Sequence, residues 1–479
     1  MSNNPIAIIG SGAGGLPAAV ALTEAGHEIL LIERGEHHSN AESKIHQHNV
    51  EAASLPWPTG EYEWRGPAGI QRAIGVGGST LRYQGVSTMP DSTVLSHWGL
   101  DAKLIEQQSK EVSRFLKVAG DVQPSHTLNP LSNHLLHSAK RLGWKARPAP
   151  VAILSKPTST RPACNHCGMC VFGCLPGDKT TAANSWLPRA EKTGRLKLLT
   201  GTRVEKIVLK DKQTAAGLRI ARGKTKETIP VSAVILAAGA LETPYLLKSS
   251  KQHLAPQGLG NDAVGRYLTG TLNHSAIAIG TRHATNAHAG IPVDVLINEF
   301  ENQGIILCQG RNLGGITGPI SAAQFHLRRY GPVGLREWMQ KNYQKIAVLA
   351  AMVETGGRYV DGLAGEQKSY SIGTSTQAKQ KLAKAQQCLY AWAKQAAAEI
   401  IFEPDINAES ATGAMLRGSC RIGSSANDSA VGPNGILRGY KNIMVTDASV
   451  LGSGVIAHPS LLIQTLSYSF ASRFAETLS

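Results

Sequence analysis

A short glycine-rich turn near the N-terminus places the tightest constraint on what this chain can fold into. Residues 5–9 form an apolar run that predicts a buried strand, and the sequence GSGAGG follows at residues 10–15. An Ala- and Leu-rich helix is then expected over residues 16–25, and residues 28–33 predict a second strand. The order of strand, glycine turn, helix and strand is typical of the first unit of a dinucleotide-binding fold.

The glycines of this turn have the spacing that a bound dinucleotide requires. Gly10, Gly12 and Gly15 fit G-x-G-x-x-G, in which the tight turn, the close approach of a pyrophosphate and the helix–strand packing each need a residue without a side chain. The phosphates would then lie at a helix N-terminus, where free N–H groups attract anions. Glu33 ends the second strand, where an acidic residue accepts hydrogen bonds from the ribose. The sequence has no second fingerprint, so one dinucleotide is expected.

Composition excludes several classes of protein. The 479 residues allow roughly two to four domains, and 42% hydrophobic against 17% charged residues excludes a disordered chain. No run of 18 apolar residues exists, so no membrane span is expected, and the absence of a signal segment favours a cytoplasmic location. The net charge of +15 is spread without a dense basic run. It indicates a basic surface, or one that attracts an acidic ligand or protein, rather than a nucleic-acid partner.

Periodicity predicts further elements along the chain. A long helix is expected over residues 377–401, followed by Pro404. Other helices are expected at 101–118, 131–143 and 460–476, and strands at 196–199, 203–209, 233–237 and 443–445.

Five ordered motifs make the sequence resemble the glucose–methanol–choline (GMC) oxidoreductases, a family of FAD enzymes. The first is the segment 10–35, which ends in Glu-Arg-Gly, and the second is GVGGSTLRY at 75–83. The third is GALETPYLL at 239–247, although Lys251 stands where glycine is usual. The last two are GSCRIG at 418–423 and VTDASV at 445–450, with His-Pro after it at 458–459.

The resemblance implies an α/β fold in two parts. A Rossmann-like FAD-binding domain would be built from residues 1–95, 195–275 and 410–479. A substrate-binding domain, an antiparallel sheet with helices, would comprise residues 276–409. Residues 96–194 would add a helical segment with a cysteine-rich loop at 157–178.

The resemblance also implies which residues contact FAD. Arg82 occupies the region where some relatives carry a histidine bonded to the flavin, so the FAD is expected to be non-covalent. The expected contacts are Gly10, Gly12, Ala13, Gly14, Gly15, Glu33, Arg34, Gly77, Gly78, Ser79, Tyr83, Val204, Ala238, Gly239, Asp447, Ala448, His458 and Pro459.

The expected reaction is oxidation of a CH–OH group in a small metabolite, by hydride transfer to flavin N5. Arg82 and the net charge favour an anionic substrate.

The family's catalytic pair is usually a histidine and then a histidine or asparagine. His458 aligns with the second position, but Met415 aligns with the first and cannot accept a proton. Three interpretations are open: His458 is the sole base, the base is His274 or His326, or the reaction is of another kind, such as a desaturation.

Four cysteines in eleven residues form the most specific local pattern. Cys164, Cys167, Cys170 and Cys174 have the spacing C-x₂-C-x₂-C-x₃-C of a ferredoxin half-motif. Some relatives hold an iron–sulfur cluster at about this place, so these residues are candidate ligands, with zinc and metal-free thiols as alternatives; His166 inside the loop is a weaker candidate. A cluster would indicate a protein electron acceptor, or an electron-transfer subunit of a larger complex.

Overall fold

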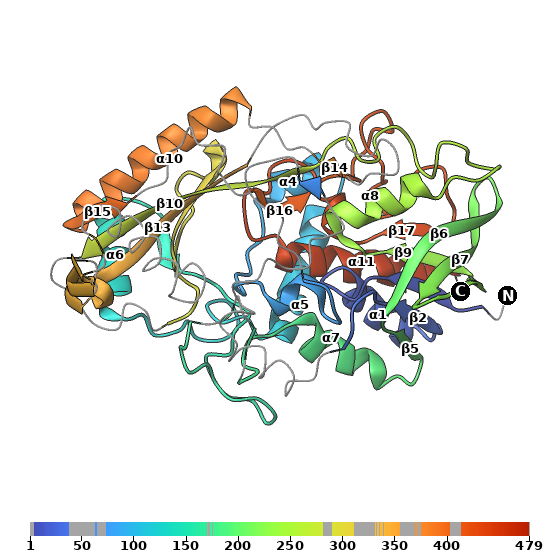
Figure 1. The fold of residues 1–479 in the computed structure, drawn as a ribbon, viewed down its shortest axis with the longest axis horizontal. Helices are drawn as coiled ribbons and strands as arrows, with labels where there is room; N and C mark the ends of the chain where they lie inside the picture. Colours follow the sequence, from blue (N-terminus) through green and yellow to red (C-terminus); the bar gives the residue numbers. More distant parts are fainter. Residues whose placement is uncertain are drawn as a thin grey trace.

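The computed structural model describes residues 4–37, 63–64, 73–168, 170, 173–174, 176–280, 290–310, 331–354 apart from 332, 335 and 339, 369–370, 375–402 and 413–478. Two lobes are visible, each built around its own sheet (Figure 1). Within these ranges no helix combines the length and the apolar character needed to cross a membrane.

The first lobe contains a five-stranded parallel sheet. Its order is β17-β9-β1-β2-β5, from Ile443–Val445, Ala233–Leu236, Ile6–Ile9, Ile29–Ile32 and Leu196–Leu199. Strands β1, β2 and β9 are buried at every position, as parallel strands covered on both faces require. The expected α/β class and its parallel sheet are therefore confirmed.

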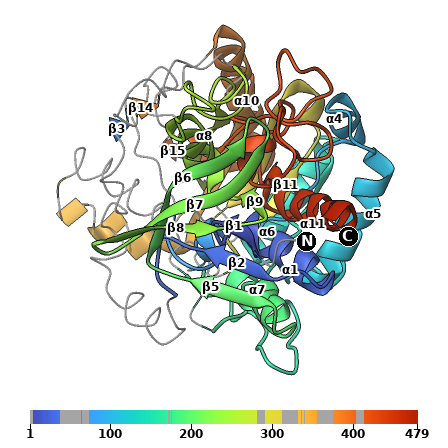
Figure 2. The same ribbon diagram turned by 90° about the vertical axis from the view of Figure 1, so that its right-hand side faces the viewer.

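Helices and a small sheet cover the two faces of the parallel sheet. Helices α1 (Gly15–Glu24), α7 (Ala182–Glu191) and α11 (Ser460–Leu478) pack against one another, and α5 (Ala102–Leu116) packs on α11. A three-stranded antiparallel sheet lies on the other face with α8 (Gly239–Ser249) (Figure 2). Its strands are β6 (Thr202–Asp211), β7 (Thr214–Arg222) and β8 (Thr225–Pro230).

The second lobe is built on a seven-stranded sheet. Six strands follow the order β15-β10-β13-β12-β11-β4, all paired antiparallel, and β16 also pairs with β10. The strands are Ala398–Phe402, Thr269–Gly280, Ile346–Glu354, Ile305–Gly310, Val293–Ile297, Ala146–Pro148 and Gly413–Arg417. Helices α10 (Thr376–Gln395) and α6 (Pro130–Arg141) pack on this sheet through an apolar cluster that includes Leu135, Leu389 and Trp392.

The long helix predicted over residues 377–401 ends earlier than expected. Helix α10 stops at Gln395, Ala397 adopts a φ of +50°, and the next residues form β15. Ile400 pairs with Ala278 of β10, so strand pairing prevails over the helix propensity of the alanines.

Shorter elements are α4 (Ser92–His97), β3 (Glu63–Trp64), β14 (Ser369–Tyr370), and the 3₁₀ turns η1 (Gly78–Leu81), η3 (Glu301–Gln303), η4 (Tyr343–Lys345) and η5 (Ala448–Val450).

Candidate active site

Among the glycines of the turn between β1 and α1, Gly12 alone could carry a Cβ without a close contact. Gly10 has a φ of +100°, and a Cβ there would lie 2.4 Å from the carbonyl oxygen of Ala237. A Cβ on Gly15 would lie 1.8 Å from the carbonyl oxygen of Gly10. At Gly12 the nearest atom would be the Cα of Gly78, 3.7 Å away. Gly10 and Gly15 are thus required by the fold itself, whereas a Cβ on Gly12 would make only ordinary van der Waals contact with the second glycine loop.

The second glycine loop lies directly against the first. Gly77 donates its N–H to the carbonyl of Ser11 at 3.1 Å, and a Cβ on Gly78 would lie 2.9 Å from the Cα of Gly12. Tyr83 is half-buried near the end of this loop and donates its hydroxyl to the carbonyl of Thr180. Ser79 accepts the backbone N–H of Tyr83 at 3.0 Å. Two loops some 65 residues apart in the sequence therefore share one surface.

Glu33 lies at the end of β2 and is 8% exposed. Its carboxylate accepts the hydroxyl of Ser11 at 2.7 Å and the backbone N–H groups of Ser11, Gly35 and Gly75 at 3.1, 2.9 and 3.3 Å. The Glu33 carboxylate thus connects the two glycine loops, because it binds Ser11 of the first loop and Gly75 of the second. Sequence reasoning missed Ser11, although its place between Gly10 and Gly12 of the motif was visible. Contact of Glu33 with a ribose stays a prediction.

Asp447 closes the same region from the C-terminal segment. Its buried carboxylate accepts the N–H of Gly239 and the N–H of Ser449, each at 2.8 Å, and the hydroxyl of Thr243. A Cβ on Gly14 would lie 2.8 Å from the Cα of Asp447, so η5 and the glycine turn are in contact. Asp447 therefore fixes the N-terminus of α8 beside the turn.

The remaining expected FAD contacts occupy several places. Ala13 packs on the core beside the turn, and Ala238 caps α8, with its Cα 3.2 Å from where a Cβ of Gly10 would be. Arg34 forms an ion pair with Glu242 of α8 at 3.1 Å. Val204 is half-buried on β6. Ala448 begins η5, and Pro459 directly precedes α11.

These features fit a bound dinucleotide. The N-cap of α1, Gly14, has no side-chain cap, and the N–H groups of Gly15 and Leu16 donate to the carbonyl of Gly12, each at 3.2 Å, so no side chain stands between the helix N-terminus and an anion. Gly12 and Gly78, neither of which has a side chain, lie against each other beside this turn. The residues that would hold the pyrophosphate are those at 10–15 and 77–79.

Met415 and His458, the two positions of the expected catalytic pair, are in direct contact. The backbone N–H of His458 donates to Sδ of Met415 at 3.0 Å. His458 is 9% exposed, and its Nε2 is buried with no hydrogen-bond partner in the described part of the chain. Burial lowers the pKa of His458 to about 4, so the imidazole is neutral near pH 7. A neutral, unpartnered ring nitrogen can accept a proton.

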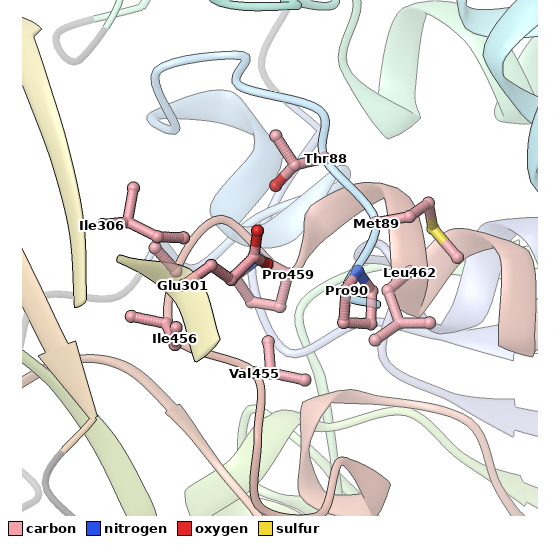
Figure 3. Close-up of a pocket in the computed structure, with 10 residues that line it drawn as sticks. Thr88, Met89, Pro90, Glu301, Ile306, Val455, Ile456, Pro459 and Leu462 are labelled. Carbon is pink, nitrogen blue, oxygen red and sulfur yellow. The ribbon is translucent and has the colours of Figure 1, made fainter. Parts of the chain in front are cut away.

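A small pocket lies where the two lobes meet (Figure 3). Ala457 and Pro459, the neighbours of His458, contribute to its wall. The pocket is also lined by Ile306 of β12, by residues 88–90 and by Glu301 of η3, which supplies a carboxylate.

The side chains of the other two candidate bases, His274 and His326, lie outside the part of the chain that the structure describes. His274 lies on β10, opposite Ala351 of β13, but its side chain is outside the described part of the structure. His326 lies outside the described residues altogether.

The cysteine-rich loop is attached to the second glycine loop. Lys179 is 0% exposed, and its Nζ donates to the carbonyls of Leu81 at 2.9 Å, Tyr83 at 3.3 Å and Cys170 at 2.5 Å. Cys174 forms a hydrogen bond with Asp178. Sequence reasoning missed Lys179, which no motif distinguished.

Cys164, Cys167, Cys170 and Cys174 are free thiols, of which Cys170 is buried and Cys167 exposed. Among the residues that the structure describes, no three His, Cys, Asp or Glu side chains are arranged to hold a metal ion. The side chains as placed do not fit a cluster. The iron–sulfur assignment stays a prediction.

A Rossmann-type sheet with a glycine turn, joined to an antiparallel lobe that meets it at a buried histidine, defines a dinucleotide-dependent oxidoreductase. Family models agree: two parts of the GMC oxidoreductase model match residues 65–269 and 337–467, and an NAD(P)-binding Rossmann-like model matches residues 8–63. The chain belongs to the GMC oxidoreductase family, as its motifs predicted.

Relatives cover nearly the whole chain at low identity. An uncharacterised GMC-type oxidoreductase of Mycobacterium tuberculosis is 26% identical over 97% of this chain and 74% of its own length. A long-chain-alcohol oxidase of Arabidopsis thaliana is 24% identical over 98% of this chain and 67% of its own. The crystal structure of pyridoxine 4-oxidase from Mesorbium loti superposes with a TM-score of 0.70 over 99% of both chains, at 18% identity, which shows the same fold.

Proposed function

We propose that this protein is an FAD-dependent enzyme that oxidises a CH–OH group of a small molecule, with His458 as the base. The observation that carries the proposal is the buried Nε2 of His458, which is unpartnered among the described residues and neutral near pH 7. Family membership supports FAD as the cofactor, and relatives named as alcohol oxidases support the reaction class.

His458, the bound FAD and Met415 have separate roles in the proposed reaction. Nε2 of His458 accepts the proton of the substrate hydroxyl as the carbonyl forms. FAD, when bound, supplies the acceptor for the hydride that leaves the same carbon. Met415 holds the His458 backbone through its sulfur, which accepts the backbone N–H at 3.0 Å.

Anaerobic reduction of the bound flavin tests this proposal. A panel of primary and secondary alcohols, neutral, cationic and anionic, is mixed with the holoenzyme, and loss of the flavin absorbance is followed. We expect at least one class to reduce the flavin, and His458→Asn to slow that reduction by about 10²- to 10⁴-fold while FAD stays bound. Reduction at the wild-type rate in His458→Asn would refute His458 as the base.

Met415 motivates a second candidate reaction. A desaturation removes a C–H proton instead of a hydroxyl proton, and a site without a base at position 415 is compatible with it. In that case no alcohol of the panel reduces the flavin, whereas a saturated carbonyl compound does.

A further inference from the structure

Two residues of the candidate site have a left-handed backbone conformation, which is unfavourable for any residue other than glycine. Met415 has a φ of +53° and His458 a φ of +54°. In this left-handed region the Cβ of an L-residue crowds the backbone, and such a residue persists only where its surroundings hold it. Strand β16, which carries Met415, pairs with β10 irregularly, with a shift between Thr269 and Thr271.

The buried side chain of Arg417 holds the first of these residues. It is 0% exposed, and its Nη1 donates to the carbonyl oxygen of Met415 at 3.0 Å and to Oγ1 of Thr271 at 3.2 Å. Its Nη2 donates to Oε1 of Glu354 at 3.3 Å. The planar guanidinium can direct these bonds to separate acceptors in one arrangement, which a lysine ammonium cannot reproduce.

The same group of side chains also holds the segment that leads to His458. The hydroxyl of Thr271 donates to the carbonyl of Ile456. The backbone N–H of Gly454 donates to both carboxylate oxygens of Glu354, at 3.1 and 3.2 Å. Three side chains from β10, β13 and β16 therefore contact the backbone on both sides of the site.

We propose that Arg417 is a positioning residue, which with Glu354 and Thr271 fixes the backbone at Met415 and at residues 454–456 and so holds the His458 imidazole where a substrate hydroxyl would lie. The proposal rests on the function proposed for His458. It differs from a purely structural ion pair because the contacts end on backbone atoms beside the site and not on another surface.

The titration of His458 provides a test that does not depend on turnover. The holoenzyme is labelled with ¹⁵N-histidine, and the His458 signal is identified by its loss in His458→Asn. In Arg417→Lys and Thr271→Val we expect the loosened segment to admit water, which raises the His458 pKa by about one unit or more. With an alcohol that reduces the flavin, we expect kcat to fall about tenfold or more while KM changes less than about twofold, because a misplaced base slows the chemical step.

Thr271→Val is the milder variant, since it removes one hydroxyl and keeps the β-branched shape, and it decides the question where Arg417 variants do not fold. Arg189→Met is the matched control. It breaks a two-bond ion pair with Glu24, at 2.7 and 2.8 Å, between α7 and α1, away from His458. It should leave the titration and kcat unchanged.

An unmoved His458 titration in the variants that fold and bind FAD would overturn the inference, even with a lowered melting temperature. A moved titration in a protein that oxidises no alcohol would support the positioning role and refute the proposed reaction instead.

Discussion

At the scale of single residues, the burial of His458 determines how the protein responds to acid. Desolvation lowers its pKa from 6.5 to about 4, so its ring stays unprotonated where an exposed histidine is charged. Because protonation removes the base, kcat/KM should fall as the pH drops through about 4, and not through 6.5. The measurement is kcat/KM against pH with a substrate that does not titrate. An acid limb near 6.5 would contradict the burial seen here.

The lowered pKa of His458 also makes the free energy of unfolding depend on pH. Between pH 4 and 6.5 the unfolded chain binds a proton at His458 that the folded chain does not bind, so this residue lowers stability as the pH falls through that window. His458→Asn should flatten the dependence. Asparagine is a suitable replacement because it tolerates the positive φ of this position.

At the scale of elements, the turn into α1 separates glycines needed for folding from one needed for the ligand. A Cβ on Gly12 meets no atom closer than 3.7 Å, whereas a Cβ on Gly15 would lie 1.8 Å from the Gly10 carbonyl oxygen. Gly12→Ala should therefore fold with wild-type circular dichroism but purify with little FAD, because the methyl group occupies space beside the phosphates. Gly15→Ala should lose soluble, folded protein. A full complement of FAD in Gly12→Ala would contradict the assignment.

The link between the cysteine-rich loop and the second glycine loop depends on Lys179. Lys179→Met would leave the buried carbonyl of Cys170 and the part-buried carbonyls of Leu81 and Tyr83 without this donor, at a cost of about 2–4 kcal/mol in the free energy of unfolding. We also expect Cys170 to react faster with a thiol reagent in the variant. In the wild-type protein Cys170 is only 5% exposed, and loss of the Lys179 contacts would make it more accessible. Lys110→Met, on the exposed side of α5, is the control and should change neither quantity. Unchanged thiol reactivity in Lys179→Met would show that the loop is held by other contacts.

Local signals predicted the elements that depend on local sequence. Residues 10–15 gave the turn, and the apolar runs gave β1, β2 and β9 almost to the residue. The end of α10 was wrong because β15 forms only through pairing with β10. Glu354 and Arg417 are 63 residues apart, and no periodicity or spacing indicates that they meet. Contacts of this kind depend on how the two sheets are placed, which sequence patterns do not report.

At the scale of the whole molecule, the candidate FAD site joins parts of the chain that are far apart in sequence. The glycine turn follows β1, the second glycine loop precedes α4, and Asp447 follows β17 near the C-terminal end. The carboxylate of Glu33 already connects the two glycine loops, and that of Asp447 connects the C-terminal segment to the N-terminus of α8. The parallel sheet places them at one edge, because the carboxyl ends of β1, β9 and β17 lie together.

A ligand that contacts all three parts must be linked to global folding. Since FAD would bind the folded chain and not the unfolded one, free FAD at about 1,000 times its Kd should add about 4 kcal/mol to the free energy of unfolding. The measurement is the melting temperature of the apoprotein against FAD concentration, with Gly12→Ala as the variant that should not respond. A wild-type melting temperature independent of FAD would place the cofactor outside this junction. A response retained in Gly12→Ala would mean that the three segments bind FAD without the glycine turn.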